Sequence, residues 1–149
     1  MTRTALLDVN VLIALFNDHH IHHEPAHDWF ADHRGRPWAT CPLTENAFVR
    51  ILSDPAQRPA LLPLPTLAGH LDRFCRDERH EFWPDGVSML DEALFNLSLV
   101  RGHRQLTDVY LLGLAVKHGG CLVTFDQSIP INAVNSATPA SLEVIAPAE

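Results

Sequence analysis

A single carboxylate interrupts the most apolar stretch of the chain, residues 4–15, which reads TALLDVNVLIAL. Asp8 lies between Leu7 and Val9, and a charge inside a packed core is costly unless a cation or several hydrogen-bond donors meet it. The residues before Asp8 suit the end of a short buried strand, and residues 11–16 suit a helix. Ligands of open α/β sheets bind at the carboxyl ends of strands. Asp8 is therefore a candidate functional residue, with simple capping of the helix as the alternative.

Length and composition fit one globular domain. The chain has 149 residues, of which 46% are hydrophobic, so we expect a single domain over residues 1–149 with a substantial core. The sequence shows neither an apolar run that could span a bilayer nor the pattern of a signal peptide, so we expect a cytoplasmic protein without a membrane segment. The cysteines, Cys41, Cys75 and Cys121, are widely spaced, which favours reduced thiols over a disulfide framework or a zinc knuckle.

The charge balance restricts the ways in which the chain can meet nucleic acid. A formal net charge of −7 argues against a protein that wraps nucleic acid with a basic face. It does not exclude an enzyme that meets phosphate through bound divalent ions, because clustered carboxylates would account for part of the excess. Lys117 is the one lysine of the chain, so phosphate contacts would come from arginine, histidine, backbone amides or a metal.

The second half of the chain contains another buried strand that ends at an acid. Thr107 suits a helix cap, and Asp108 follows it in the first turn. This helix is predicted to stop at Gly119 and to be followed by a strand over residues 121–125, which Asp126 ends. A helix, a glycine pair and an apolar strand in this order are typical of the second half of a parallel crossover.

The remaining segments alternate between helix and strand patterns. Glu45 falls in the first turn of a helix that begins at Pro42, and the flank formed by Arg73, Arg76 and Arg79 is interpreted as a solvated face. The other predicted elements are a helix to about residue 34, a strand within 36–41, a connecting loop over 53–66, helices over 67–78 and 89–100, and strands over 81–83 and 142–145.

Several histidines lie between residues 18 and 33. The spacing of His23 and His27 would place two imidazoles on one face of a helix, as zinc sites require. A third ligand at a suitable spacing is not evident in the sequence. We therefore interpret the segment as a polar loop and an exposed helix start, with Trp29 on the inward side.

Four acids occupy equivalent places in this pattern. Asp8 and Asp126 each end a buried strand, whereas Glu45 and Asp108 each open a helix. In a parallel sheet all four would face the same edge, where mutual repulsion would oppose their ionisation unless cations were bound. Oxygen ligands of this kind suit Mg²⁺ or Mn²⁺, and zinc fits these positions less well.

Four blocks that carry these acids resemble the PIN-domain family, specifically the VapC-type toxin ribonucleases. The blocks read LLDVNVLIAL, LTENAFVRIL, LTDVYLLGLAVKHGG and LVTFD, and they extend from about residue 4 to residue 126. The resemblance implies a PIN-like three-layer α/β/α fold with a central, mainly parallel sheet. It matches an acidic metal-binding and catalytic quartet, and three supporting polar positions, to the following residues: Asp8, Glu45, Asp108 and Asp126, and Asn10, Thr107 and Thr124.

The resemblance also implies an activity and partners. The expected protein is a metal-dependent endoribonuclease, the toxin of a type II toxin–antitoxin system that inhibits translation and growth. We expect Mg²⁺, or Mn²⁺, to activate a water for attack on an RNA phosphodiester. The resemblance further implies a homodimer, an RNA substrate of the tRNA or rRNA class, and a cognate VapB-type antitoxin.

Two other classes of protein share parts of the pattern. In a haloacid-dehalogenase-like phosphohydrolase, a nucleophilic aspartate is followed two residues later by a second acid, but Asn10 takes that place here. A non-catalytic receiver-like phosphoacceptor needs a lysine that reaches the acidic pocket from the last strands, and no lysine follows Lys117. Both remain alternatives to the ribonuclease.

Overall fold

A five-stranded parallel sheet forms the centre of the computed structural model, which describes residues 3–56 and 62–146. The strand order is β3-β2-β1-β4-β5, and each neighbouring pair is parallel. The strands are β1 (Ala5–Leu7), β2 (Trp38–Thr40), β3 (His80–Phe82), β4 (Cys121–Thr124) and β5 (Leu142–Val144). Successive strands are added on one side of β1 and then on the other, so the switch point for ligand binding lies between β1 and β4.

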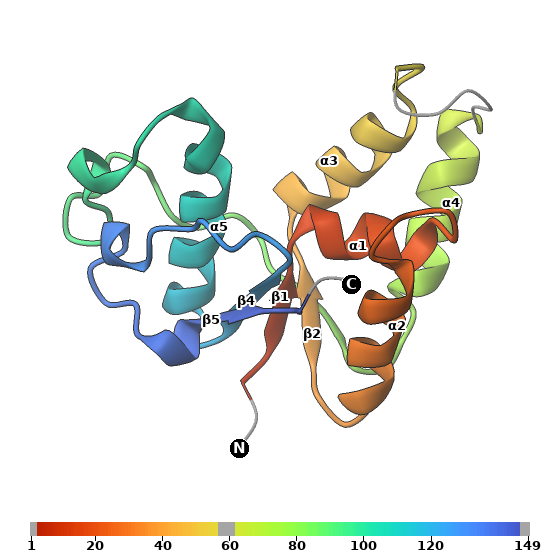
Figure 1. The fold of residues 1–149 in the computed structure, drawn as a ribbon, viewed down its shortest axis with the longest axis horizontal. Helices are drawn as coiled ribbons and strands as arrows, with labels where there is room; N and C mark the ends of the chain where they lie inside the picture. Colours follow the sequence, from red (N-terminus) through yellow and green to blue (C-terminus); the bar gives the residue numbers. More distant parts are fainter. Residues whose placement is uncertain (1–2, 57–61, 147–149) are drawn as a thin grey trace.

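Helices cover both faces of the sheet (Figure 1). On one face lie α1 (Val9–Phe16), α2 (His23–Asp32), α3 (Pro42–Leu52) and α4 (Leu64–Phe74), and on the other lies α5 (Leu106–Lys117). Short 3₁₀ turns complete the second layer: η1 (Leu97–Leu99), η2 (His103–Gln105), η3 (Ile131–Ala133) and η4 (Pro139–Ser141). The predicted three-layer α/β/α fold with a parallel sheet is confirmed. Among the described residues, no helix has the length and apolar character needed to cross a membrane.

Burial on both faces explains the apolar run at the start of the chain. Leu7 packs in the core under α1 to α4, whereas Leu6 packs in the core under α5. Both leucines are fully buried. A strand covered on two sides needs apolar residues at every position, so its sequence shows a continuous run and no alternation.

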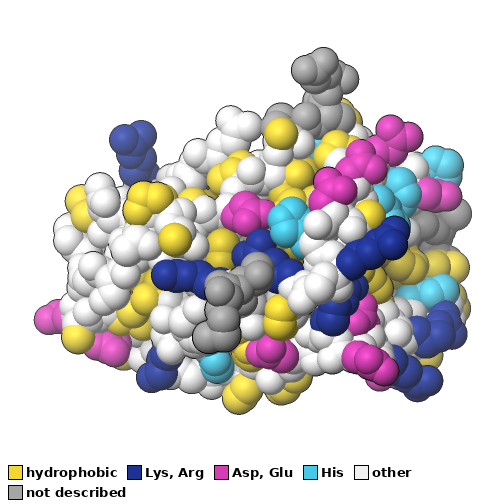
Figure 2. Space-filling view, turned by 90° about the horizontal axis from the view of Figure 1, so that it is seen from below, with side chains coloured by type: hydrophobic (Ala, Val, Ile, Leu, Met, Phe, Trp, Pro, Cys, Tyr) yellow, Lys and Arg dark blue, Asp and Glu magenta, His cyan; other side chains and the backbone are white. Residues whose placement is uncertain are grey.

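The face opposite the predicted site carries mixed charge. Figure 2 shows the molecule from below the view of Figure 1, where the N-terminus and the starts of the strands lie. Basic side chains on this face lie among acidic ones. This face therefore lacks the extended basic surface of proteins that wrap nucleic acid.

Two helix boundaries differ from the prediction. α4 starts at Leu64, inside the predicted loop, because Pro65 fits the first turn, where its missing N–H is not needed; residues 57–61 of that loop lie outside the described part. α5 continues directly from the η2 turn, so Thr107 lies inside the helix and is not its cap. The other predicted strands and helices, apart from residues 89–100, match the structure within a few residues.

The prediction of a solvated arginine flank is wrong for Arg79. Its guanidinium forms an ion pair with Asp77 at 2.7 Å and donates to the carbonyl oxygens of His33 and Arg34. It also lies over the Phe30 ring, 4.6 Å from the ring centroid. Arg79 therefore connects the end of α2 with the turn before β3, and a charge pattern on one helix face could not reveal these distant partners.

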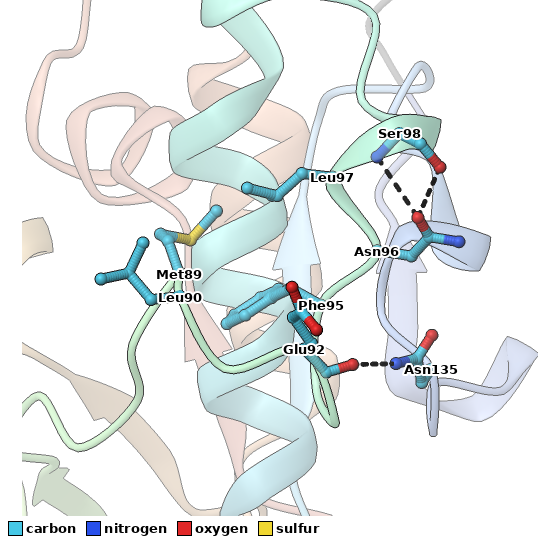
Figure 3. A pocket seen from close by; sticks show the side chains of 8 residues that line it. All are labelled: Met89, Leu90, Glu92, Phe95, Asn96, Leu97, Ser98 and Asn135. Carbon is cyan, nitrogen blue, oxygen red and sulfur yellow. Dashed lines mark hydrogen bonds between the residues drawn. The ribbon is translucent and has the colours of Figure 1, made fainter.

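The helix predicted over residues 89–100 is also wrong, since this segment contains only the η1 turn. Side-chain oxygens of Ser88, Asp91 and Asn96 each accept a hydrogen bond from the backbone N–H two residues later, at 3.0 to 3.2 Å. Such local bonds compete with helical hydrogen bonds. Figure 3 shows the resulting loop, in which Asn135 also donates to the carbonyl oxygen of Glu92.

Close packing of α5 depends on one glycine. Phe95, which is 3% exposed, lies directly against Gly113 in the middle of α5. A Cβ atom on Gly113 would overlap the Phe95 ring, whereas a Cβ atom on Gly69 in α4 would meet nothing within 4 Å. The two glycines therefore have opposite roles in two helices of similar length.

We predict that Gly113→Ala lowers the free energy of unfolding by about 1–3 kcal/mol, because a buried aromatic ring must move. Gly69→Ala is the matched control and should raise the free energy of unfolding by about 0.5–1 kcal/mol, through helix propensity alone. Chemical denaturation of both variants measures the difference. Equal shifts in the same direction would contradict the packing described for α5.

Candidate active site

Asp8 lies at the switch point, directly after β1, and is 2% exposed. Its Oδ1 accepts a hydrogen bond from the N–H of Val9 at 2.7 Å, and its Oδ2 accepts one from the Thr124 hydroxyl at 2.9 Å. Burial raises the pKa of Asp8, and these two hydrogen bonds oppose that rise. Asp8 thus caps α1 with one oxygen and contacts β4 with the other. Each oxygen keeps a further lone pair, so capping of the helix does not prevent Asp8 from binding a cation.

Thr124 connects the ends of β1 and β4. Its fully buried hydroxyl accepts hydrogen bonds from Asn10 Nδ2 at 3.1 Å and from the N–H of Asp126 at 3.0 Å. A hydroxyl has two acceptor lone pairs and one hydrogen, so the hydrogen must be donated to Asp8. The Asn10 carbonyl oxygen accepts in turn from the N–H of Phe125 at 3.3 Å. The directions of the four hydrogen bonds of Thr124 and Asn10 are therefore fixed.

Asp126 is held by the turn that follows β4. Its Oδ1 accepts hydrogen bonds from the backbone N–H of Ser128 at 2.8 Å and from the Ser128 hydroxyl at 2.7 Å. Burial raises the pKa of Asp126, but the two Ser128 bonds and a hydrogen bond with Asp108 outweigh it, and the pKa lies below its ordinary value. Asp126 is therefore ionised at neutral pH.

Asp108, in the first turn of α5, completes a group of three interacting carboxyl groups. Burial and the neighbouring Asp8 and Asp126 raise the pKa of Asp108 to about 8. Three carboxylates from β1, β4 and α5 thus meet at one edge of the sheet, where their repulsion opposes full ionisation. A divalent cation would remove that repulsion.

Glu45 lies in the first turn of α3, but its side chain has different partners. Its Oε2 accepts a hydrogen bond from the Thr40 hydroxyl at 2.7 Å, and Thr40 Oγ1 lies 2.8 Å from His80 Nε2. Within residues 3–56 and 62–146, no hydrogen bond or ion pair connects Glu45 with the three aspartates. The structure therefore brings together three of the four predicted acids and leaves Glu45 beside Thr40.

The three predicted supporting residues also differ in their contacts with the site. Asn10 and Thr124 contact the site as described, whereas Thr107 is exposed on α5. No side-chain hydrogen bond of Thr107 exists in the described part of the chain. The sequence pattern could not distinguish the two threonines, because each lies close to an aspartate in the chain. Thr107 directly precedes Asp108, and Thr124 lies two residues before Asp126.

A comparison of the sequence with models of protein families identifies the family of this chain. Residues 5–134 match the family model of the PIN domain. The chain belongs to the PIN-domain family. The matched range contains the four predicted acids, from Asp8 after β1 to Asp126 after β4.

Named relatives of this PIN domain are ribonucleases. It is 43% identical over 145 residues to ribonuclease VapC44 of Mycobacterium tuberculosis, an alignment that covers 95% of this chain and 99% of the relative. It is 38% identical over 142 residues to ribonuclease VapC39 of the same organism, again with 95% and 99% coverage.

Solved structures share the fold of this PIN domain at lower identity. A toxin–antitoxin complex from Klebsiella pneumoniae contains a chain with 17% identity and a TM-score of 0.57, over 98% of this chain and 99% of that one. The crystal structure of PAE2754 from Pyrobaculum aerophilum gives 22% identity and a TM-score of 0.56, over 95% and 84%. At these identities the similarity supports the fold alone.

Two contacts of the site were missed by sequence reasoning. Ser128 follows Asp126 by two residues, a spacing at which an aspartate commonly accepts hydrogen bonds from the following backbone and hydroxyl, so a local signal was present. Thr40 ends β2 and meets His80 only through the pairing of β2 with β3. That contact is tertiary, and no local pattern contains it.

We predict that Thr124→Val in this PIN domain lowers the free energy of unfolding by about 1–3 kcal/mol, because Asp8, Asn10 and Asp126 each lose a buried partner. The affinity for Mn²⁺ should fall about 10–100-fold, since the residues that orient the ligands are lost. Denaturation and calorimetric Mn²⁺ titration measure both effects. Thr107→Val is the matched control and should change stability by less than about 0.5 kcal/mol; equal effects of the two variants would contradict the assigned roles.

We also predict that Asp108→Asn stabilises the metal-free protein at alkaline pH. Because the pKa of Asp108 is raised to about 8 on folding, wild-type stability falls as pH rises from about 4 to about 8. The advantage of the variant should therefore grow over this range, to the order of 1–2 kcal/mol after allowance for solvent screening. Denaturation in chelator at about pH 5 and pH 8.5 measures it, and an advantage that is the same at both pH values would be the contrary result.

Proposed function

We propose that this PIN domain is a metal-dependent endoribonuclease that hydrolyses RNA phosphodiester bonds. It would act as the toxin of a type II toxin–antitoxin system that inhibits translation and growth. The observation that carries the proposal is the meeting of Asp8, Asp108 and Asp126 at the switch point of the sheet. Relatives named ribonucleases that align over nearly their whole length support it, and PIN-domain ribonucleases depend on metal ions.

The predicted quartet, Asp8, Glu45, Asp108 and Asp126, is assigned here as metal-binding and catalytic. Repulsion between the carboxylates opposes their full ionisation, and a bound cation would remove that repulsion. Oxygen ligands of this kind suit Mg²⁺, and Mn²⁺ could take its place. When bound, such an ion supplies a water of lowered pKa and offsets the charge that develops on phosphodiester oxygens. Mg²⁺ keeps several waters, so not every carboxylate needs to contact it directly.

The individual carboxylates have different electrostatic properties in this proposal. Asp8 is fixed by Val9 and Thr124 and is suited to direct ligation. Asp108 carries a proton at neutral pH when no cation is near, so loading of the site is coupled to release of that proton. Asp126 stays ionised, which suits it to accept a hydrogen bond from the attacking water.

Glu45 would join this group by a change of side-chain rotamer. It lies at the carboxyl edge of β2, next to β1, because α3 starts directly after that strand. Turning away from Thr40 costs one hydrogen bond, and attraction to a bound cation would offset that cost. Glu45 is therefore the mobile member of the quartet in this proposal.

Partners follow from the same site. We propose a VapB-type antitoxin with an arginine that pairs with these carboxylates, a homodimer, and a substrate of the tRNA or rRNA class. The chain would act as one domain over residues 1–149, in the cytoplasm, where such RNA is found. A dehalogenase-like reaction is less suited to the site, because both polar groups of Asn10 are already bonded to β4 and its end.

Cleavage of folded RNA by the purified protein tests the function. We expect cleavage that requires Mg²⁺ or Mn²⁺ and falls on the order of 100-fold or more in Asp8→Asn, because a charge that stabilises the transition state is lost. Asp32→Asn is the matched control: Asp32 is exposed at the end of α2, near the opposite edge of the sheet, and should keep full activity. Turnover of a phosphomonoester without cleavage of RNA would instead support the dehalogenase-like alternative and refute the proposal.

A further inference from the structure

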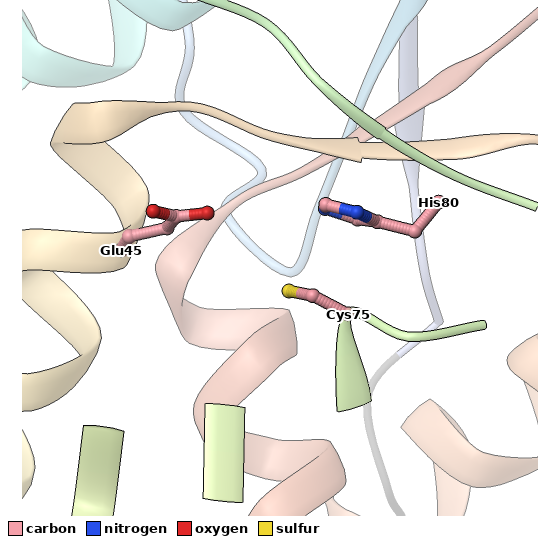
Figure 4. Close-up of side chains that lie close together, drawn as sticks. All are labelled: Glu45, Cys75 and His80. Atoms are coloured by element: carbon pink, nitrogen blue, oxygen red, sulfur yellow. The ribbon is translucent and has the colours of Figure 1, made fainter. Parts of the chain in front are cut away.

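Three potential metal ligands of different chemistry meet beside the acidic site. Glu45 comes from the first turn of α3, Cys75 follows the last residue of α4, and His80 begins β3. One ligand atom from each lies within 4.8 Å of the other two, and in the described residues this is the one such group of three or more. Figure 4 shows the carboxylate, the sulfur and the imidazole directed toward one another.

The donor set suits a different ion from the one that the aspartates suit. Thiolate and imidazole are ligands that zinc prefers. Three protein ligands and a water in the fourth position form a tetrahedral zinc site. Mg²⁺ favours oxygen ligands and gains little from sulfur. All three side chains are half-buried, and Glu45 and Cys75 line a cleft between α3 and α4 through which an ion can enter.

A fourth side chain orients two of the three ligands. The Thr40 hydroxyl is fully buried and lies 2.7 Å from Glu45 Oε2 and 2.8 Å from His80 Nε2. Hydrogen bonds of this kind fix the orientation of metal ligands and are part of most metal sites. The single hydrogen of the Thr40 hydroxyl is donated to Glu45, so His80 Nε2 donates to Thr40 and an ion would bind the free lone pair of His80 Nδ1.

Within the described residues, the pair of His23 and His27 has no third potential ligand close enough to form a metal site. His23 and His27 have ring centroids 4.3 Å apart, but His23 Nδ1 is bonded to the carbonyl oxygen of Ala14 at 2.8 Å and His27 Nε2 to that of Leu15 at 2.7 Å. Zinc at this pair would have to displace one of these bonds or use the outer nitrogens without a third ligand. The two bonds connect α2 with the end of α1, which gives the pair a structural role.

We propose that Glu45, Cys75 and His80 form a Zn²⁺ site that withdraws Glu45 from the Mg²⁺ site and thereby inhibits the nuclease. The binding part stands on the geometry alone, and the inhibition rests on the proposed function. Zinc would keep Glu45 turned toward Cys75, and the acidic site would then have three carboxylates in place of four. Zinc deprotonates a coordinating thiol, so binding would release the proton of Cys75 and would become tighter as the pH rises.

Metal binding to the full chain tests the site without reference to activity. We expect one tight Zn²⁺ by competition with a chromophoric chelator, with affinity reduced about 10–100-fold or more in Cys75→Ala and in His80→Gln. Co²⁺ in place of Zn²⁺ should give a thiolate charge-transfer absorption that Cys75→Ala lacks. His70→Gln, in α4 near Cys75 in the chain but outside the group, and Asp8→Asn should keep both signals.

Thermal unfolding shows whether Cys75→Ala and His80→Gln are folded. One folded variant is enough for the test, so misfolding of the other does not prevent it. Zn²⁺ affinity that is unchanged in folded Cys75→Ala, or a Co²⁺ complex without the thiolate absorption, would overturn the proposed site. An affinity lost in Asp8→Asn and kept in Cys75→Ala would place the ion among the aspartates and would also overturn it.

The inhibition is tested by RNA cleavage in excess Mg²⁺ with increasing Zn²⁺. We expect the wild type to lose activity at Zn²⁺ concentrations that leave Cys75→Ala active, a shift of about 10-fold or more in the inhibitory concentration. Equal inhibition of the two proteins would overturn the regulatory part. Absence of cleavage by the wild type in Mg²⁺ alone would refute the proposed function, while the binding experiment still decides the zinc site.

Discussion

The hydrogen bond from the buried Thr124 hydroxyl to Asp8 is the interaction on which the rest of the site depends. A carboxylate at the end of a strand that is buried on both faces has few partners, and without donors its ionised form would be strongly disfavoured. Thr124 supplies one donor, and its two acceptor positions also fix Asn10 and Asp126. One hydroxyl thus makes the buried charge tolerable and aligns the ends of β1 and β4.

The parallel sheet determines which residues can join this group. Each strand ends at the same edge, so the residue that follows a strand and the first turn of the next helix face one another across the switch point. Asp8 and Asp126 follow strands, whereas Asp108 opens α5. Burial, together with the neighbouring Asp8 and Asp126, raises the pKa of Asp108 to about 8, so Asp108 keeps a proton at neutral pH. Such a group is unfavourable in a protein without a ligand, so it is typical of a functional site.

Much of the fold could be predicted from the sequence, because the relevant signals are local. Apolar runs mark β1 and β4, and Gly119, with a positive φ of 68°, ends the helix before β4. Residues 89–100 have a helical pattern of apolar residues, but bonds within each turn, such as that from the N–H of Ala93 to Asp91, decide their conformation. Apolar periodicity does not record that competition.

The site could be predicted only in part, for a related reason. The acids were identified by their places at the ends of strands and starts of helices, and a resemblance of the surrounding blocks supported the choice. The direction of the Glu45 side chain depends on Thr40 and His80, which come from two other strands. The contact between Thr40 and His80, 40 residues apart in the chain, depends on the pairing of β2 with β3 and has no signature in a single sequence.

The location of a bound Mn²⁺ ion would show whether the aspartates at the switch point form the metal site. A crystal of the protein grown with Mn²⁺ and measured at the manganese absorption edge would show the ion by its anomalous scattering. We expect an anomalous peak at the switch point, next to carboxylate oxygens of Asp8 and Asp108. A peak found only elsewhere in the molecule, with Asp8 still bonded to Thr124 and Val9 alone, would contradict it.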